Sequence, residues 1–226
     1  MNYSRFIAVG LFVLILLFAF ALPNPDVVPD LEKGDLDLPW NIRVHEDNSS
    51  EVFQLRLTHS TLADAITRFR EPEGIAIYKG AKSDSLEAYF GTVNIGPLKA
   101  KLVTTLQTSP AEIEEMLSRS TGLSLSDSAD KKIELAVEDR QQALNKKISA
   151  ITFIPTYSGL ESDFFKDRFG EPDAWIRLNE NAVQYFYPSK GLSIIIDVEG
   201  KEVLQYNHPD SFQLPEEAVT EAINPA

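Results

Sequence analysis

The chain contains no cysteine in its 226 residues. This absence excludes disulfide bonds, catalysis by a thiol, cysteine-based metal sites and a lipid-modified N-terminal cysteine. Histidine is scarce as well, with only His45, His59 and His208 present. None of them lies at metal-ligand spacing from another, and no H-x-x-H or H-E-x-x-H pattern occurs. We therefore expect neither a metal ion nor a cofactor.

Sequence motifs of catalysis are also missing. The chain has no G-x-S-x-G motif, no P-loop and no G-x-G-x-x-G motif. Carboxylates are abundant, but none is recognisably paired with a nucleophile. The sequence therefore predicts a protein that is not an enzyme. Two alternatives stay open: an envelope hydrolase with a dispersed site, and a small-ligand binder that uses a groove between the two halves of the chain.

Positive charge is in short supply. Lysine and arginine number 21 against 34 aspartates and glutamates, which gives a net charge of −13. Binding to phosphate backbones requires clustered lysine and arginine. We therefore exclude nucleic acid as a partner.

The most prominent feature that is present is an apolar run at residues 6–22. Arg5 precedes it and acidic residues follow from Asp26 onward, an asymmetry that places the N-terminus in the cytoplasm. Its length of about 17 residues suits either a membrane anchor or a signal segment, and Ala19-Phe20-Ala21 resembles a cleavage site. The strong apolarity favours a retained anchor. We thus expect a single-pass inner-membrane protein of a Gram-negative bacterium, with its C-terminal domain in the periplasm.

The rest of the chain divides by composition. Residues 23–39 combine prolines with acidic residues, which predicts a solvated linker. Beyond it we expect a first α+β unit, a helical connecting segment, a second α+β unit and a tail. Their predicted bounds are residues 40–106, 107–148, 149–208 and 209–226.

Hydrophobic periodicity predicts the elements of the first unit. Residues 51–57 alternate, with Phe53, Leu55 and Leu57 on one face, which indicates a half-buried strand. Ser60 or Thr61 can then cap a helix that ends before Pro72. Its apolar positions follow the spacing i, i+3, i+4, i+7 and are Leu62, Ala65, Ile66 and Phe69. Strands are predicted at residues 74–78, 86–93 and 98–106.

A similar order of elements is predicted later in the chain. Ser109, Pro110 and Glu112 form a helix-start signal with a capping box. A strand and a helix are then expected at residues 149–155 and 160–169. Further strands are predicted at residues 175–178, 183–187, 192–198 and 203–206.

The pentapeptide RFREP at residues 68–72 returns as RFGEP at residues 168–172. The fold class predicted from this is α+β: an N-terminal transmembrane helix followed by two repeated units, each a helix packed on an antiparallel β-meander. We interpret the motif as structural, with each phenylalanine closing a helix stripe and each arginine pairing with the glutamate three residues on. The alternative is a ligand clamp. Arg70 in place of Gly170 indicates that the backbone need not be left-handed in both copies.

Two stretches, GLESDFFKDRFGEPD and VQYFYPSKGLSIIIDVEGKEV, resemble the SmpA/BamE-like domain. The matching residues are Phe169, Gly170, Pro172, Tyr185, Tyr187, Ile196, Asp197 and Gly200. A tandem pair of such units is also similar in architecture to the β-lactamase inhibitor protein. The resemblance implies a role among cell-envelope proteins. Proteins of this type are usually outer-membrane lipoproteins, and in this cysteine-free chain residues 6–22 would have to replace the lipid anchor.

Adjacent aromatic residues predict where a partner binds. Tyr89-Phe90 and Tyr185-Phe186-Tyr187 place an aromatic side chain on both faces of a strand. One face packs on the helix, and the other meets either the second half of the chain or another protein. The candidate partner-binding residues are Tyr89, Phe90, Phe186 and Tyr187. The predicted function is a non-catalytic, membrane-anchored periplasmic protein that binds or scaffolds envelope proteins, as an accessory subunit of an inner-membrane complex.

Overall fold

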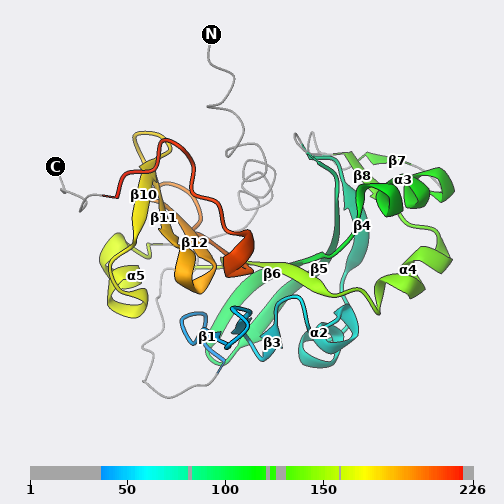
Figure 1. Ribbon diagram of the computed structural model, residues 1–226, viewed down its shortest axis with the longest axis horizontal. Helices are drawn as coiled ribbons and strands as arrows, with labels where there is room; N and C mark the ends of the chain where they lie inside the picture. The colour runs from blue at the N-terminus through cyan, green and yellow to red at the C-terminus, as the bar shows by residue number, and fades with distance from the viewer. Residues whose placement is uncertain (1–36, 81–82, 121–122, 126–130, 158, 221–226) are drawn as a thin grey trace, which may run out of the picture.

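The computed structural model describes residues 37–80, 83–120, 123–125, 131–157 and 159–220. This part of the chain is built on one large antiparallel sheet, with a small three-stranded sheet beside it (Figure 1). The large sheet has ten strands in the order β10-β11-β12-β13-β9-β6-β5-β4-β8-β7. The small sheet has the order β1-β2-β3.

Strands from both halves of the chain contribute to the large sheet. In chain order they are β4 (Gly74–Tyr78), β5 (Ser85–Ile95), β6 (Leu98–Leu106), β7 (Leu123–Leu125), β8 (Lys131–Glu134), β9 (Ile148–Pro155), β10 (Ala174–Arg177), β11 (Ala182–Tyr187), β12 (Leu192–Asp197) and β13 (Val203–Asn207). The small sheet consists of β1 (Arg43–Val44), β2 (Ser50–Val52) and β3 (Leu55–Arg56). The helices are α2 (Leu62–Phe69), α3 (Pro110–Arg119), α4 (Val137–Ala143) and α5 (Ser162–Phe169), with short 3-10 turns η2 (Pro188–Lys190) and η3 (Pro209–Ser211).

Two helix starts lie where the sequence predicts them. Thr61 caps α2, because its side chain accepts a hydrogen bond from the Asp64 backbone and the Asp64 carboxylate accepts one from the Thr61 backbone. Ser109 and Glu112 form the same reciprocal arrangement at the start of α3. The capping box predicted at Ser109 and Glu112 is thus confirmed, and of the two caps that the sequence allows for α2 the structure uses Thr61.

The strand predicted at residues 51–57 is wrong. Phe53 and Gln54 adopt positive φ angles of 56° and 63°, which turns the chain back and separates β2 from β3. The alternating residues are nevertheless buried, and Phe53 packs against Phe153 and Tyr206 at ring-centroid distances of 5.5 and 5.6 Å. The hairpin therefore delivers a large aromatic side chain to the core without joining the large sheet.

The expected pair of repeated units is also corrected. β9 pairs with β6 on one side and with β13 on the other, so hydrogen bonds continue without interruption from the first half of the chain into the second. The protein is mostly antiparallel sheet, with one shared sheet in place of two helix-plus-meander units. Local alternation predicts many of the strands, but it cannot show which strands pair across the chain.

The expected membrane anchor finds no support. In the part of the chain that the structure describes, no helix is both long enough and apolar enough to cross a membrane. Residues 6–22, on which the anchor and the inner-membrane location were predicted, lie outside that part. The structure therefore supports neither the anchor nor the inner-membrane location.

One main hydrophobic core fills the space between the large sheet, the small sheet and the helices. Buried residues of all four α-helices named above belong to it, among them Leu62, Ile113, Ala143 and Phe165. The face of the large sheet that carries this core is called the first face here, and the opposite side is called the second face. In Figure 1, α2 and α5 lie on the same side of the sheet.

Candidate functional site

Two of the four predicted partner-binding residues lie in the main core. The Phe90 ring contacts Phe69 at a centroid distance of 5.9 Å, and the Tyr187 ring contacts Phe169 at 5.8 Å. The Tyr187 hydroxyl donates a hydrogen bond to the Gly170 carbonyl at 3.0 Å. Phe90 is 5% exposed and Tyr187 is fully buried, so neither side chain offers a surface to a partner.

The other two, Tyr89 and Phe186, lie on the second face and in the same cross-strand row. Tyr89 is half-buried, whereas Phe186 is 3% exposed and packs against Phe212, so Phe186 offers no more surface than Phe90 does. The strand register links Phe186 to Ser193 and onward across four more strands to Tyr89. The row reads Phe186, Ser193, Gln205, Thr152, Val103 and Tyr89. Residues predicted from separate halves of the chain therefore share one continuous face.

The second face mixes apolar and polar side chains. Ile154, Ile195 and Val203 form a small hydrophobic cluster that is separate from the main core. Val103 and Gln205 are half-buried at the centre of the row. The buried apolar residues of α2, α3, α4 and α5 all belong to the main core, and none of them belongs to this small cluster.

Burial controls the charges on this face. Desolvation raises the pKa of Tyr89, with a further contribution from the nearby Glu73 carboxylate. Desolvation also lowers the pKa of Lys101 and raises the pKa of Glu87. Gly91 permits the close approach of Glu73, because a Cβ atom at position 91 would lie 1.8 Å from a Glu73 carboxylate oxygen. Glu87 and Lys101 are thus partly shielded from solvent on this face.

The C-terminal segment, residues 212–220, meets the large sheet at β10. The Trp175 N–H donates to the Val219 carbonyl at 2.9 Å, and the Val219 N–H donates to the Trp175 carbonyl at 2.8 Å. At the other end of the segment the Phe212 ring packs edge-on against Phe186 at 6.2 Å. The sequence did not predict the pairing of Val219 with Trp175, because one paired residue produces no alternation of apolar and polar residues.

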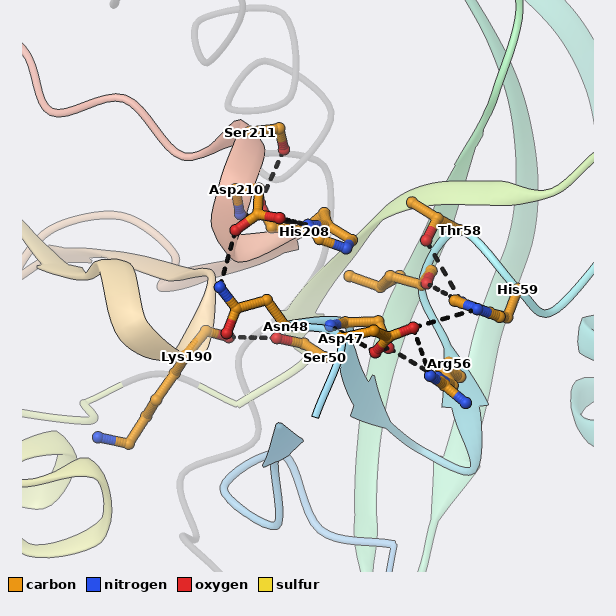
Figure 2. A network of polar contacts seen from close by, with 12 residues as sticks. Asp47, Asn48, Ser50, Arg56, Thr58, His59, Lys190, His208, Asp210 and Ser211 are labelled. Carbon is orange, nitrogen blue, oxygen red and sulfur yellow. Dashed lines mark hydrogen bonds and ion pairs between the residues drawn. The ribbon is translucent and has the colours of Figure 1, made fainter. Parts of the chain in front are cut away.

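His59 and His208 lie in a polar network beside the small sheet (Figure 2), His45 directly follows β1, and each of the three histidines contacts a carboxylate. His45 Nε2 lies 2.9 Å from Glu51, His59 Nε2 lies 3.4 Å from Asp47, and His208 Nδ1 lies 4.0 Å from Asp210. These residues come from distant positions, so their spacing in the sequence gave no signal.

Asp47 is the centre of that network. Its carboxylate accepts hydrogen bonds from the Ser49 hydroxyl at 2.7 Å and from the Arg56 guanidinium at 2.6 Å. These bonds lower the pKa of Asp47 well below its usual range, with the Ser49 hydroxyl as the largest cause. The network ties the small sheet to η3, because the Asn48 amide donates to Asp210 at 2.8 Å.

The network does not form a nucleophilic site. The fully buried Ser49 hydroxyl donates to Asp47 and accepts from Arg56 Nε at 2.6 Å, which occupies it with two charged partners. The His59 ring faces Asp47 and the Leu57 carbonyl, and so provides no base for the serine. The neighbouring cavity of about 540 Å³ is lined by Val44, His45, Glu46, Asp47 and Arg56.

A second shallow cavity of about 440 Å³ is acidic, with Asp197, Glu180 and Glu199 in its lining. The Asp197 carboxylate accepts hydrogen bonds from the backbone of Glu199 and Gly200, so it serves the turn after β12. Across the described ranges, no group of three or more histidines or carboxylates could hold a metal ion.

The arginines of the repeated motif contact residues 37–40, where the described part of the chain begins. Arg68 pairs with Asp37 at 2.6 Å, and the Arg168 guanidinium lies over the Trp40 ring at 4.9 Å and the Phe164 ring at 3.8 Å. Glu171 pairs with Lys166 at 3.0 Å. The predicted Arg–Glu pairs within each motif are therefore wrong, because the arginines reach across the fold to residues 37–40.

Comparison with known proteins identifies no relative: no family model, no curated protein and no solved structure matches this chain. The resemblance to the SmpA/BamE-like domain stays a prediction.

Proposed function

We propose that this protein is a non-catalytic binding protein that holds another protein on the second face of its large sheet. One observation supports this most directly. The row from Phe186 to Tyr89 crosses six strands, and Val103, Gln205 and Tyr89 in it are half-buried, whereas Phe186, Ser193 and Thr152 are 3–4% exposed. A wide face that mixes aliphatic, aromatic and uncharged polar groups has the composition of the centre of a protein interface.

The charges on this face favour a protein partner over an ionic ligand. Lys101 and Glu87 lie next to the row, and burial acts against the charged form of both. The Glu73 carboxylate lies near Tyr89 and Lys101. Interface centres are poor in charged residues and rich in aromatic ones. The proposed partner is another envelope protein, the class that the resemblance to the SmpA/BamE-like domain implies.

Site-specific photo-crosslinking tests the proposal. A photoreactive amino acid placed at Val103 or Gln205 is expected to give one discrete adduct with a second protein in the cells that produce this chain. The control position is Thr67, which is exposed on α2, on the other side of the sheet. Equal adducts from Thr67, or no adduct from either second-face position, would contradict the proposal.

A further inference from the structure

The large sheet stops at the outer edge of β10. In an antiparallel strand, alternate residues direct their backbone groups to opposite neighbours. Trp175 bonds outward to Val219, so Arg177, two residues later, also directs its N–H and C=O outward. An edge with outward-facing backbone groups is a template for pairing with another chain.

The C-terminal segment covers this edge with few contacts. Among the described residues, the reciprocal pair between Trp175 and Val219 provides the only backbone hydrogen bonds from the segment to β10. Leu214 and Val219 remain 42% and 39% exposed. The segment therefore pairs with β10 through a single residue, Val219. The outward backbone groups of Arg177 make no hydrogen bond to the segment.

The apolar groups around the Trp175–Val219 bridge favour a particular kind of residue at this edge. Directly paired residues in an antiparallel ladder place their side chains on the same face of the sheet. Val219 therefore shares the first face with Trp175, which packs against the main core. A residue in this position must have a free N–H to donate to the Trp175 carbonyl, and an apolar, β-branched side chain suits the ring beside it.

We propose that the outer edge of β10 is a strand-addition site for an extended peptide. The C-terminal segment occupies the site in cis, and a peptide from another protein occupies it in trans. The peptide places a valine-like residue opposite Trp175 and continues the ladder to Arg177. This edge is a different surface from the second face, so the two proposals fail separately.

The test uses the full-length protein with Val219→Pro, which removes the N–H that donates to Trp175. A labelled peptide that copies residues 213–220 is the probe. The variant is expected to bind this peptide at least tenfold more tightly than the unaltered chain, since an attached segment competes at an effective concentration in the millimolar range. Val219→Thr is the matched control, because threonine keeps both the N–H and the β-branched shape, and it is expected to behave like the unaltered chain.

Hydrogen exchange at Trp175 provides a second readout. Its amide is expected to exchange faster in Val219→Pro and to regain protection when the peptide is added. The proposal is overturned if the folded variant does not bind the peptide, or if a peptide with proline at the position of Val219 binds equally well. The proposal is also overturned if the variant forms a dimer that the peptide does not dissociate. In that case the edge of β10 would bind a second copy of the chain. Crosslinking from Val103 is expected to be unaffected by the peptide.

Discussion

The helices α2 and α5 each span eight residues and end in nearly the same pentapeptide, yet they differ at both ends. At the C-terminal end, Arg70 has φ 78° and ψ −176°, while Gly170 has φ 85° and ψ 179°. The backbone is therefore the same in both, contrary to the expectation drawn from the arginine. This conformation is essentially confined to glycine, and it costs another residue on the order of 1–3 kcal/mol.

The comparison shows that the fold imposes this turn in both places. Phe69 and Phe169 are buried at the last helical position, and the chain must then turn sharply to enter β4 or β10. Glycine meets the requirement at position 170 without strain, whereas Arg70 adopts it under strain. At the N-terminal ends the advantage lies with α2 instead. Helix α2 has a side-chain cap at Thr61, whereas α5 has none at Glu161.

Removing either phenylalanine is expected to have the largest effect. Phe69→Ala and Phe169→Ala should each lower the free energy of unfolding by about 3–5 kcal/mol, because each leaves a cavity in the main core. Chemical denaturation measures the change, and Phe→Leu at each position is the control that keeps most of the volume. An unchanged midpoint at either position would show that the two helix ends do not perform the same packing role.

Exchanging the residues at the helix ends should change stability in opposite directions. Arg70→Gly is expected to stabilise the protein by about 1 kcal/mol, since relief of strain exceeds the added entropy of the unfolded chain. Gly170→Ala should destabilise it by about the same amount. A Cβ atom at position 170 would meet no atom within 4 Å, so the cost is that of the backbone alone. Two changes of the same sign in thermal denaturation would rule out this explanation.

The helix starts should respond less strongly. Thr61→Ala is expected to cost about 1 kcal/mol, because it removes the side chain that accepts from the Asp64 backbone. Glu161→Ser should instead add a few tenths to about 1 kcal/mol by creating a cap where none exists. Thr61→Ser serves as the neutral control in urea denaturation. A loss of stability in Glu161→Ser would show that Glu161 has another role.

The two arginines are expected to show the smallest effects, about 1 kcal/mol or less each. They should differ in their response to salt. The Arg68–Asp37 pair is partly exposed and weakens as ionic strength rises, whereas Arg168 lies against the rings of Trp40 and Phe164. Denaturation of Arg68→Ala and Arg168→Ala at low and high salt measures this, with Glu71→Ala as the silent control. Equal salt dependence would mean that both arginines act through the same kind of contact.

Short-range signals in the sequence predict the helices well. The sequence allows Ser60 or Thr61 as the cap of α2 and places its end before Pro72, and in the structure Thr61 is the cap and the helix ends at Phe69. Ser109 and Glu112 correctly predict the start of α3. The strands β5 and β6 also lie within two residues of their expected bounds. In each case the physical cause lies within a few residues of the element.

Long-range features could not be predicted in the same way. The hairpin at Phe53 and Gln54 depends on positive φ angles in residues that rarely adopt them, so its alternating pattern resembles a strand. The pairing of β6 with β9 depends on edges that local patterns do not describe. For the candidate site, the alternation placed Tyr89 and Phe186 next to core aromatics, but only the register shows that they share one row.

The position of β9 between β6 and β13 has a consequence for synthesis on the ribosome. β6 is complete at Leu106, but the strand that covers its outer edge begins only at Ile148. β9 in turn ends at Pro155, and the strand that covers its other edge, β13, begins only at Val203. At translation rates of 5–20 residues per second, each exposed edge persists for roughly 2–10 seconds. During that interval the nascent chain presents a bare strand edge to its neighbours, so its vulnerability to aggregation lasts until β13 has emerged.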